Sequence, residues 1–494
     1  MLPFFMPIFL MYLQFMNKII ITVFFLLTAY LFSFGQKASL GNQYFHRTQC
    51  IEDITQLQKT LTQYHPSLYT YTSKKDLQNK FNTYIYSLPD SINSYQFHTD
   101  LTLLINQVRD GHLYLSTNQT MNHFEIQQGH LLPFSFRIFD YKLFIQSNYG
   151  DSSVERWDVV TKINGVPSTE LIYELLPMIP TDGYCSSRKL KLLEENFSLL
   201  YSRKYGFSTS FEITIISKSN LSKPSKHLIK GVKTNLLIEK SSEKKQSLFF
   251  EIDKTKSRAY LKVPSFNSYK IEHAGINWSK WLKAHFNKLQ SDSVHSLILD
   301  LRGNEGGNVL LMSQLMEYLL LSDFQLYQSI TINNQLLKSP SIILSEKQTK
   351  KLKKQTVFRN DSSLWNEKFT KHYYFPKKAT FSGKLFVLID GGTYSSASHA
   401  VQLLQERKDT NFYGNETGGN GVSSNAGKTV IIKLENSNFN LHLPLMKGLY
   451  KTKKVFSSTS GILPDKYCGN ELLMELKYSD ICLLEILEDI VRKK

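Results

Sequence analysis

Hydrophobic spacing divides most of the chain into segments with different expected structures. Between about residues 45 and 115, apolar positions recur with helical spacing in IEDITQLQKTLTQYHPSLYTY and FHTDLTLLINQVRDGH. Prolines interrupt this pattern, and we expect His65, which precedes one of them, to contact a helix end. From about 125 to 235, short runs such as YKLFIQS and FEITIIS predict strands that alternate with turns and one helical patch. The pattern therefore predicts a small helical region followed by a compact, mostly β module.

The last segment contains unbroken apolar runs instead of alternating ones. HSLILDLRG and KLFVLIDGG each end in a glycine-rich turn that precedes a helical pattern. Strands that are apolar at every position are usually buried on both faces of a sheet. This predicts an α/β domain whose sheet is covered by helices on both sides. We place the helical region at residues 36–120, the β-rich module at 121–240 and the α/β domain at 241–494.

The amino terminus predicts export. From Met16, one lysine precedes an apolar run of signal-peptide length, and the small residues Ser33 and Gly35 follow it. We expect a signal peptide at residues 1–35 and a periplasmic or extracellular mature protein. The apolar stretch before Met16 leaves a membrane tether as the alternative.

Charge and cysteine content narrow the functional classes. The formal net charge is +17, but the lysines and arginines are scattered and no nucleic-acid-binding motif accompanies them, so we expect no nucleic-acid partner. The four cysteines form no CxxC pair, which argues against a structural zinc site. Export permits disulfides, and Cys468 with Cys482 is the nearest candidate pair.

Two turns at the carboxyl ends of predicted strands are the candidates for chemistry, because open α/β sheets leave a crevice there. DLRGNEGGN lacks the spacing of a phosphate-binding loop, so it is either a plain turn or an anion hole for a reacting carbonyl. LIDGGTYSSAS places hydroxyl residues between a strand and a helix. On this turn alone, helix capping and nucleophilic catalysis both remain open, and the GxSxG elbow is absent.

The combination of motifs is more informative than either turn. In order, the chain contains VRDGHLYLS, INGVPS, AYLKVPSF, LILDLRGNEGGN, LIDGGTYSSAS, YGNETGG and GILPD. From about residue 45 to 470 it resembles the serine peptidases that include tail-specific (C-terminal processing) proteases, the tricorn core and interphotoreceptor retinoid-binding protein. The resemblance implies a PDZ-like β-rich middle domain and a crotonase/ClpP-like α/β catalytic core.

The resemblance also implies roles for individual residues. Ser395 matches the family nucleophile, with Ser396 and Ser398 as alternatives in register. The backbone N–H of Ser396, together with that of Gly306 or Gly307, would form the oxyanion hole.

The catalytic base distinguishes the branches of this family. Tail-specific proteases place a lysine about 25 residues after the serine, where this chain has Asn420, whose amide cannot accept a proton. Lys428 is a less favoured substitute. His112 in RDGHLYL is similar to the histidine motif of the tricorn and retinoid-binding branch, and an unperturbed imidazole, with a pKa of about 6.5, can accept a serine proton at neutral pH. We therefore predict Ser395 with His112 and a closer relation to that branch.

The group that orients the base is not evident from the sequence. The tricorn branch has a serine beside the histidine, where this chain has Gly111, and a glutamate before GxxPD, where it has VFSSTS. Glu416 and Asp110 are the nearest acidic substitutes. We expect Asp300 and Asp465 to anchor turns.

These features predict an exported serine endopeptidase that forms an acyl-enzyme on a peptide or protein substrate without a metal or organic cofactor. The substrate would bind as an added β-strand at a sheet edge. The alternative is a non-proteolytic ligand- or peptide-binding protein on the same fold, and an esterase would use the same residues.

Overall fold

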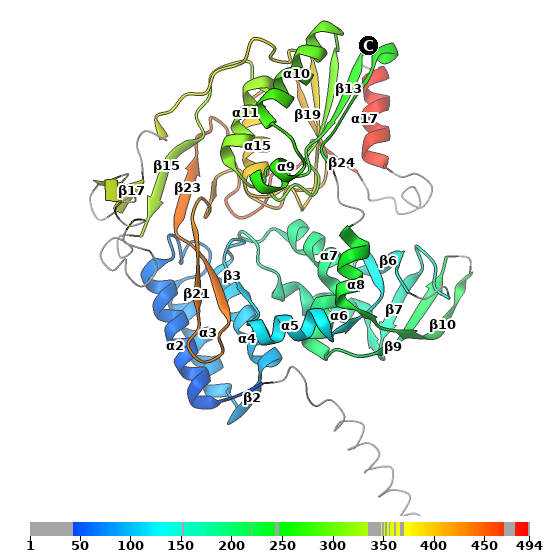
Figure 1. Cartoon of the computed structure of the whole chain (residues 1–494), viewed down its shortest axis with the longest axis vertical. Helices are drawn as coiled ribbons and strands as arrows, with labels where there is room; N and C mark the ends of the chain where they lie inside the picture. Colours follow the sequence, from blue (N-terminus) through cyan, green and yellow to red (C-terminus); the bar gives the residue numbers. More distant parts are fainter. Residues whose placement is uncertain are drawn as a thin grey trace, which may run out of the picture. The chain divides into compact units, whose positions relative to one another are not determined.

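The computed structural model describes residues 43–150, 153–218, 220–242, 247–333, 347, 350, 353–354, 356–359, 362–365, 370–468 and 480–492 (Figure 1). The predicted leader at residues 1–35 lies outside these ranges. The described residues belong to a compact unit that begins at Tyr44. Within them, we find no helix with the length and apolar character needed to cross a bilayer.

The amino-terminal segment is mainly helical, as its hydrophobic spacing predicts. Ser73 and Asn93 cap two of its helices, because each side chain accepts a hydrogen bond from the backbone N–H three residues later. His65 is the C-cap residue of the first helix and precedes a proline, as expected. The elements are β1 (Tyr44–His46), α2 (Arg47–Tyr64), α3 (Lys74–Ser87), β2 (Ser91–Asn93), α4 (Ser94–Ile105), η1 (Asn106–Val108), β3 (Tyr114–Ser116) and α5 (Gln119–Gln127).

The middle segment forms an antiparallel sheet in the order β10-β9-β7-β6-β5. Asn164 and Gly165 both have positive φ, so INGVPS makes the tight hairpin turn that its Asn-Gly pair predicts. The sheet packs on α6 and the longer α7 through a shared apolar core. The elements are β4 (His130–Leu131), β5 (Phe134–Phe139), β6 (Lys142–Asn148), β7 (Val159–Ile163), β8 (Val166–Pro167), α6 (Ser168–Leu175), η2 (Leu176–Met178), α7 (Ser186–Tyr205), β9 (Ser210–Ser217), β10 (Asn220–Lys230), β11 (Val232–Lys233) and α8 (Thr234–Ser242).

The third segment contains the predicted α/β sheet, in the order β12-β13-β14-β18-β19-β24. All pairs are parallel except β12 with β13. Every residue of β14 is buried, because α10, α11 and α15 cover one face of the sheet and α17 covers the other (Figure 1). The elements are β12 (Phe249–Asp253), β13 (Arg258–Lys262), α9 (Ser268–His273), α10 (Trp278–Ser291), β14 (Ser296–Asp300), α11 (Val309–Leu319), β18 (Lys384–Ile389), α15 (Ser396–Leu404), β19 (Thr410–Gly414), β24 (Lys466–Tyr467) and α17 (Ile481–Arg492).

Strands from the third segment also extend into the helical region. β22 (Asn440–Pro444) pairs with β21 (Thr429–Lys433) on one side and with β3 on the other. A further sheet in the order β16-β17-β15-β23-β20 contributes to the same apolar core as α2 and α4. Its strands are β15 (Tyr327–Ile332), β16 (Thr356–Arg359), β17 (Ser362–Trp365), β20 (Ser423–Ser424) and β23 (Met446–Tyr450). The predicted segments 36–120 and 241–494 therefore share one core.

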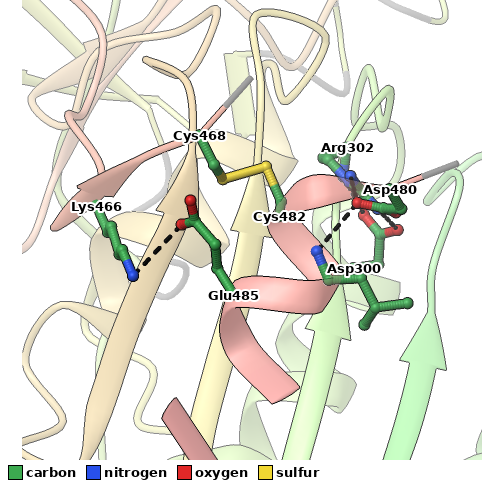
Figure 2. The surroundings of a disulfide bond; sticks show 8 residues. Asp300, Arg302, Lys466, Cys468, Asp480, Cys482 and Glu485 are labelled. Atoms are coloured by element: carbon green, nitrogen blue, oxygen red, sulfur yellow. Dashed lines mark hydrogen bonds and ion pairs between the residues drawn. A yellow bond between two sulfur atoms is a disulfide. The ribbon is translucent and has the colours of Figure 1, made fainter. Parts of the chain in front are cut away.

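A disulfide joins α17 to the end of the main sheet (Figure 2). Cys468 and Cys482, the nearest candidate pair in the sequence, form the bond, with a Cα–Cα distance of 5.4 Å. Arg302 lies in the turn after β14 and makes two hydrogen bonds to Asp480, directly before α17. The helix is thus held by a covalent bond and an ion pair.

Candidate active site

Ser395 occupies a strained position between β18 and α15. Its φ of 53° and ψ of −122° lie in a region that residues other than glycine rarely adopt, at a cost of about 1–3 kcal/mol. Ser395 stands at the N-cap of α15, but its side chain makes no capping hydrogen bond. The capping explanation for this serine therefore does not apply.

Hydrogen bonds from neighbouring side chains hold this turn. Thr393 Oγ1 accepts the backbone N–H of Asp390 and donates to the carbonyl of Leu301 in the adjacent glycine turn. Asp390 Oδ1 accepts the N–H groups of Gly303 and Gly392. The two turns singled out in the sequence are therefore tied together at the same edge of the sheet.

His112 lies beside this serine, although 283 residues separate them in the chain. The distance from His112 Nε2 to Ser395 Oγ is 3.2 Å. His112 precedes β3, and its backbone N–H donates to Asp110 Oδ1 at 2.8 Å. The side chain is 17% exposed. The structure thus brings together the two residues predicted as nucleophile and base.

The other imidazole nitrogen contacts Tyr394, which the sequence analysis did not single out. Tyr394 Oη lies 2.8 Å from His112 Nδ1 and donates to Asp182 Oδ1 at 3.1 Å. Because the single phenol proton goes to Asp182, the Tyr394 oxygen is left to accept the Nδ1 proton. This arrangement favours the tautomer with a lone pair on Nε2, facing Ser395.

Asp182 is buried behind Tyr394, in the loop before α7. Burial raises the pKa of its carboxyl, and the neighbouring His112 partly offsets this. Oδ1 also accepts the backbone N–H of Gly111 at 2.8 Å. A Cβ on Gly111 would lie 2.3 Å from Tyr394 Oη, so glycine is needed here for the phenol to reach the imidazole.

Asp110, one of the two candidate orienting acids, makes its side-chain hydrogen bonds to His65 and Asn425 and not to the His112 ring. Its Oδ2 contacts His65 Nε2 at 2.8 Å and accepts a hydrogen bond from Asn425, whereas its Oδ1 lies 3.9 Å from His112 Nδ1. Burial alone would raise the pKa of Asp110, but the hydrogen bond and charge of His65 and the charge of His112 lower it below its usual value. Asp110 therefore faces the base without a hydrogen bond to its ring.

The structure places Glu416, the other acidic candidate, in a different contact. Glu416 Oε1 accepts the backbone N–H of Gly461, and its recorded contacts do not include His112. Asn420 closes a turn by accepting the N–H groups of two following residues. Asp300 accepts the N–H of Arg302 in its own turn, as expected, whereas Asp465 accepts the N–H of Phe412 in β19 and so links two segments.

The glycine turn passes directly over Ser395. A Cβ on Gly306 would lie 2.8 Å from the nitrogen of Ser396 and 3.0 Å from Cβ of Ser395. The N–H of Gly306 is already donated to Asn304 Oδ1, whereas the N–H groups of Gly307 and Ser396 have no recorded acceptor among the described residues. Of the predicted oxyanion donors, Gly307 and Ser396 are thus the two available ones.

The other serines of the turn face elsewhere. Ser398 Oγ donates to the carbonyl of Thr393 at 2.9 Å, and Ser396 Oγ is buried without a partner in the described structure. Ser395 is the serine of this turn that contacts His112.

Asp110, His112 and Asp182 offer ligand atoms within 4.8 Å of one another, a spacing that could hold a metal ion. Tyr394 Oη contacts both His112 Nδ1 and Asp182 Oδ1, and backbone N–H groups bind both carboxylates. These atoms are therefore already engaged in a hydrogen-bond network.

A cavity of about 880 Å³ opens beside the serine. Its lining includes Ser395, His112, Gly307 and apolar side chains from α7 and β21. Buried polar atoms without a partner in the described structure also line it, namely His98 Nε2, Thr102 Oγ1, Asn106 Oδ1 and two nitrogens of Arg188. A cavity with such atoms suits a ligand that carries its own hydrogen-bonding groups.

A serine hydroxyl beside an imidazole is the arrangement that serine hydrolases use for nucleophilic catalysis. Residues 257–467 match the model of peptidase family S41. This part of the chain is therefore similar to peptidase family S41, which supports a serine-type peptidase.

The fold is similar to that of solved structures of CPAF. Mature CPAF complexed with lactacystin matches with a TM-score of 0.60 at 15% identity, covering 85% of this chain and 94% of that chain. A CPAF mutant matches with a TM-score of 0.63 at 12% identity, covering 85% and 93%. The photosystem II D1 C-terminal processing protease matches with a TM-score of 0.42 at 12% identity, covering 86% and 94%. The search of curated protein sequences found no match.

Proposed function

We propose that the chain is an exported serine endopeptidase that cleaves peptide bonds through an acyl-enzyme on Ser395, with His112 as general base. The observation that carries this proposal is the 3.2 Å contact between His112 Nε2 and Ser395 Oγ. The strained backbone of Ser395 and the family match support it. Export rests on the predicted leader alone.

In the acylation step, Ser395 Oγ forms a bond to the peptide carbonyl carbon while its proton moves to His112 Nε2. The tetrahedral intermediate then collapses, the C–N bond breaks, and the proton passes to the leaving amine. Water repeats the sequence on the acyl-enzyme, releasing the carboxylic acid and restoring the serine hydroxyl. The reaction therefore requires one base and one water molecule and no other reactant.

The N–H groups of Gly307 and Ser396 would stabilise the oxyanion, because neither is committed to another acceptor in the described residues. Each such donor contributes about 3 kcal/mol to the transition state. Tyr394 and Asp182 would keep the imidazole in its reactive tautomer. Both would also stabilise the imidazolium that forms during the reaction.

The substrate would be an extended peptide that crosses the cavity and satisfies its unpartnered polar atoms. Residues 121–240 would serve as a PDZ-like domain and 241–494 as a crotonase/ClpP-like core, in the tricorn and retinoid-binding branch. A sheet edge of either part would receive the peptide as an added strand.

Labelling with a serine-directed fluorophosphonate tests this proposal. We expect the native chain to be labelled and to cleave an unstructured protein such as casein. Ser395→Ala should abolish labelling, and His112→Ala should slow it by about 10³-fold or more. Ser398→Ala removes a hydroxyl from the same turn and is the matched control that should still label.

The outcomes separate the alternatives of the sequence analysis. Labelling that survives Ser395→Ala would contradict the nucleophile assignment. A folded native chain that is neither labelled nor active would favour the non-proteolytic binding protein. Cleavage of simple esters without cleavage of any peptide would favour the esterase.

A further inference from the structure

Arg188 is a buried cation without a hydrogen-bond partner in the described structure. It is the third residue of α7, is 6% exposed, and lines the same cavity as Ser395 and His112. Its Nε and Nη1 atoms are buried and unpartnered. Its Nη2 lies 3.7 Å from Glu305 Oε1, beyond the usual length of a hydrogen bond.

Other arginines of the chain are paired in the way that burial normally requires. Arg203 makes two hydrogen bonds to Glu125, at 2.9 and 2.8 Å. Figure 2 shows Arg302 between two carboxylates, to which it donates through both terminal nitrogens. A guanidinium withdrawn from water is costly unless its donors are used. Arg188 therefore differs from these two arginines, because none of its guanidinium nitrogens donates a hydrogen bond within the described structure.

The surroundings of Arg188 connect it to the catalytic groups. Its guanidinium carbon lies 3.5 Å from the centroid of the Tyr394 ring, and that ring also stacks on His112 with centroids 4.8 Å apart. A ligand of Arg188 would thus bind close to the reacting bond. Glu305, its present counter-ion, belongs to the glycine turn and has a side chain that is 60% exposed. An exposed carboxylate at 3.7 Å can be replaced by one that binds more closely.

We propose that Arg188 binds a carboxylate group of the substrate and that this carboxylate replaces Glu305. The planar guanidinium suits a carboxylate because two parallel N–H donors match its two oxygens. The carboxylate is an acidic side chain near the cleaved bond or the carboxyl terminus of the peptide. The inference rests on the proposed function, which supplies the substrate class. It adds that the peptidase prefers peptides with a carboxylate placed to reach Arg188.

Equilibrium binding to the inactive Ser395→Ala chain tests the proposal without requiring turnover. Three matched peptides are used: one with an internal Glu and an amidated terminus, one with Gln and a free terminus, and one with Gln and an amidated terminus. We expect one of the two carboxylate peptides to bind about 10- to 100-fold more tightly than the neutral peptide. The peptide that gains affinity identifies the source of the carboxylate.

Substitutions at the site then assign the preference to Arg188. Adding Arg188→Gln should reduce the affinity ratio to about 1, Arg188→Lys should retain part of it, and Glu305→Gln should increase it, because the competing carboxylate is gone. Circular dichroism confirms that each variant is folded. The affinity ratio falls in Arg188→Gln and rises in Glu305→Gln. A general loss of structure would not change the ratio in opposite directions.

The failure of this inference and the failure of the proposed function give different results. Equal binding of all three peptides, or a preference that persists in folded Arg188→Gln, would overturn the carboxylate site while leaving hydrolysis by Ser395 intact. Carboxylate-dependent binding that requires Arg188, in a chain that never hydrolyses a peptide, would overturn the peptidase assignment alone and support the site.

Discussion

Tyr394 links His112 to Asp182, a contact that no sequence motif indicates. It immediately precedes Ser395, yet its hydroxyl lies between His112 and Asp182 and not in the helix-capping turn. Burial, followed by the nearby Asp182, raises its pKa well above the usual value, so its hydroxyl stays protonated and can donate. The link from base to acid thus passes through a neutral phenol.

Tyr394→Phe removes this link and keeps the ring that stacks on His112. We expect kcat to fall about 10- to 100-fold with KM nearly unchanged, because the tautomer is no longer fixed. Steady-state hydrolysis of one peptide by both chains measures this. An unchanged kcat would exclude a positioning role for the hydroxyl.

Gly111→Ala tests the same link from the other side. The added methyl group would lie 2.3 Å from Tyr394 Oη and would force the phenol away from the imidazole. We expect fluorophosphonate labelling to slow by about tenfold while the fold persists. Gly165→Ala, where the new Cβ meets no atom within 4 Å but φ is +83°, is a comparison for the backbone strain of losing a glycine away from the site. Equal labelling rates in native and Gly111→Ala chains would contradict this account.

Asp110 gives the site a pH dependence of stability. Its pKa is lower in the folded chain than the unfolded value of about 3.9, so its contribution is complete above about pH 5 and is lost as the pH falls through the folded pKa. We expect Asp110→Asn to lower the unfolding free energy by about 3 kcal/mol at pH 7. This difference should shrink in strong acid. Urea unfolding of both chains at several pH values measures it, and a difference that grows in acid would contradict the assignment.

The sequence indicates some of these residues and not others. Ser395, His112 and the glycine turn belong to motifs with recognisable residue types and spacing. Asp182 stands in a loop of the β-rich segment, 70 residues after His112, and no local pattern relates it to the site. Its role depends on a phenol that could equally have packed in the core. Side-chain contacts between distant segments are set by tertiary packing, which periodicity does not report.

Among the elements, α17 is attached to the main sheet by apolar packing, a disulfide and ion pairs. The disulfide closes a loop with a sequence separation of 14, and Asp480, two residues before Cys482, pairs with Arg302 (Figure 2). Constraining a loop of this size stabilises a fold by about 3 kcal/mol.

We therefore expect the double variant Cys468→Ser, Cys482→Ser to lose about 3 kcal/mol of unfolding free energy, with exchange protection lost first in α17. Denaturant unfolding and hydrogen exchange measure the two effects. Reductant should destabilise the native chain and leave the double variant unchanged. Equal stability of the native chain with and without reductant would argue against the bond.

The elements themselves follow the hydrophobic pattern closely. Helical spacing before residue 115 and unbroken apolar runs at β14 and β18 correspond to the structure. The pairing of β22 with β3 does not follow from it, because the two strands lie more than 300 residues apart. Periodicity identifies a strand but not its partner.

At the scale of the whole molecule, the described unit is built from interleaved segments. Residues of the helical region and of β15, β22 and β23 form one apolar cluster. A fragment of residues 241–494 would expose its part of that cluster, and a stable fold requires it to be covered.

We expect the fragment 241–494 to be aggregated or loosely packed when made alone, although it contains Ser395 and the whole family match. Adding the fragment 36–240 during refolding should restore part of the fluorophosphonate labelling. Near-ultraviolet circular dichroism and labelling measure both effects. A cooperatively folded, reactive 241–494 fragment would show that the shared core is dispensable.

The long distance along the chain between His112 and Ser395 has a consequence for biosynthesis. During translation His112 is synthesised before Ser395, and β22, which pairs with β3 next to His112, is synthesised after both. The nascent polypeptide therefore cannot form the β3–β22 pair before residue 444 has been synthesised. Any hydrolysis that depends on the contact between His112 and Ser395 would therefore begin only after this pairing has formed.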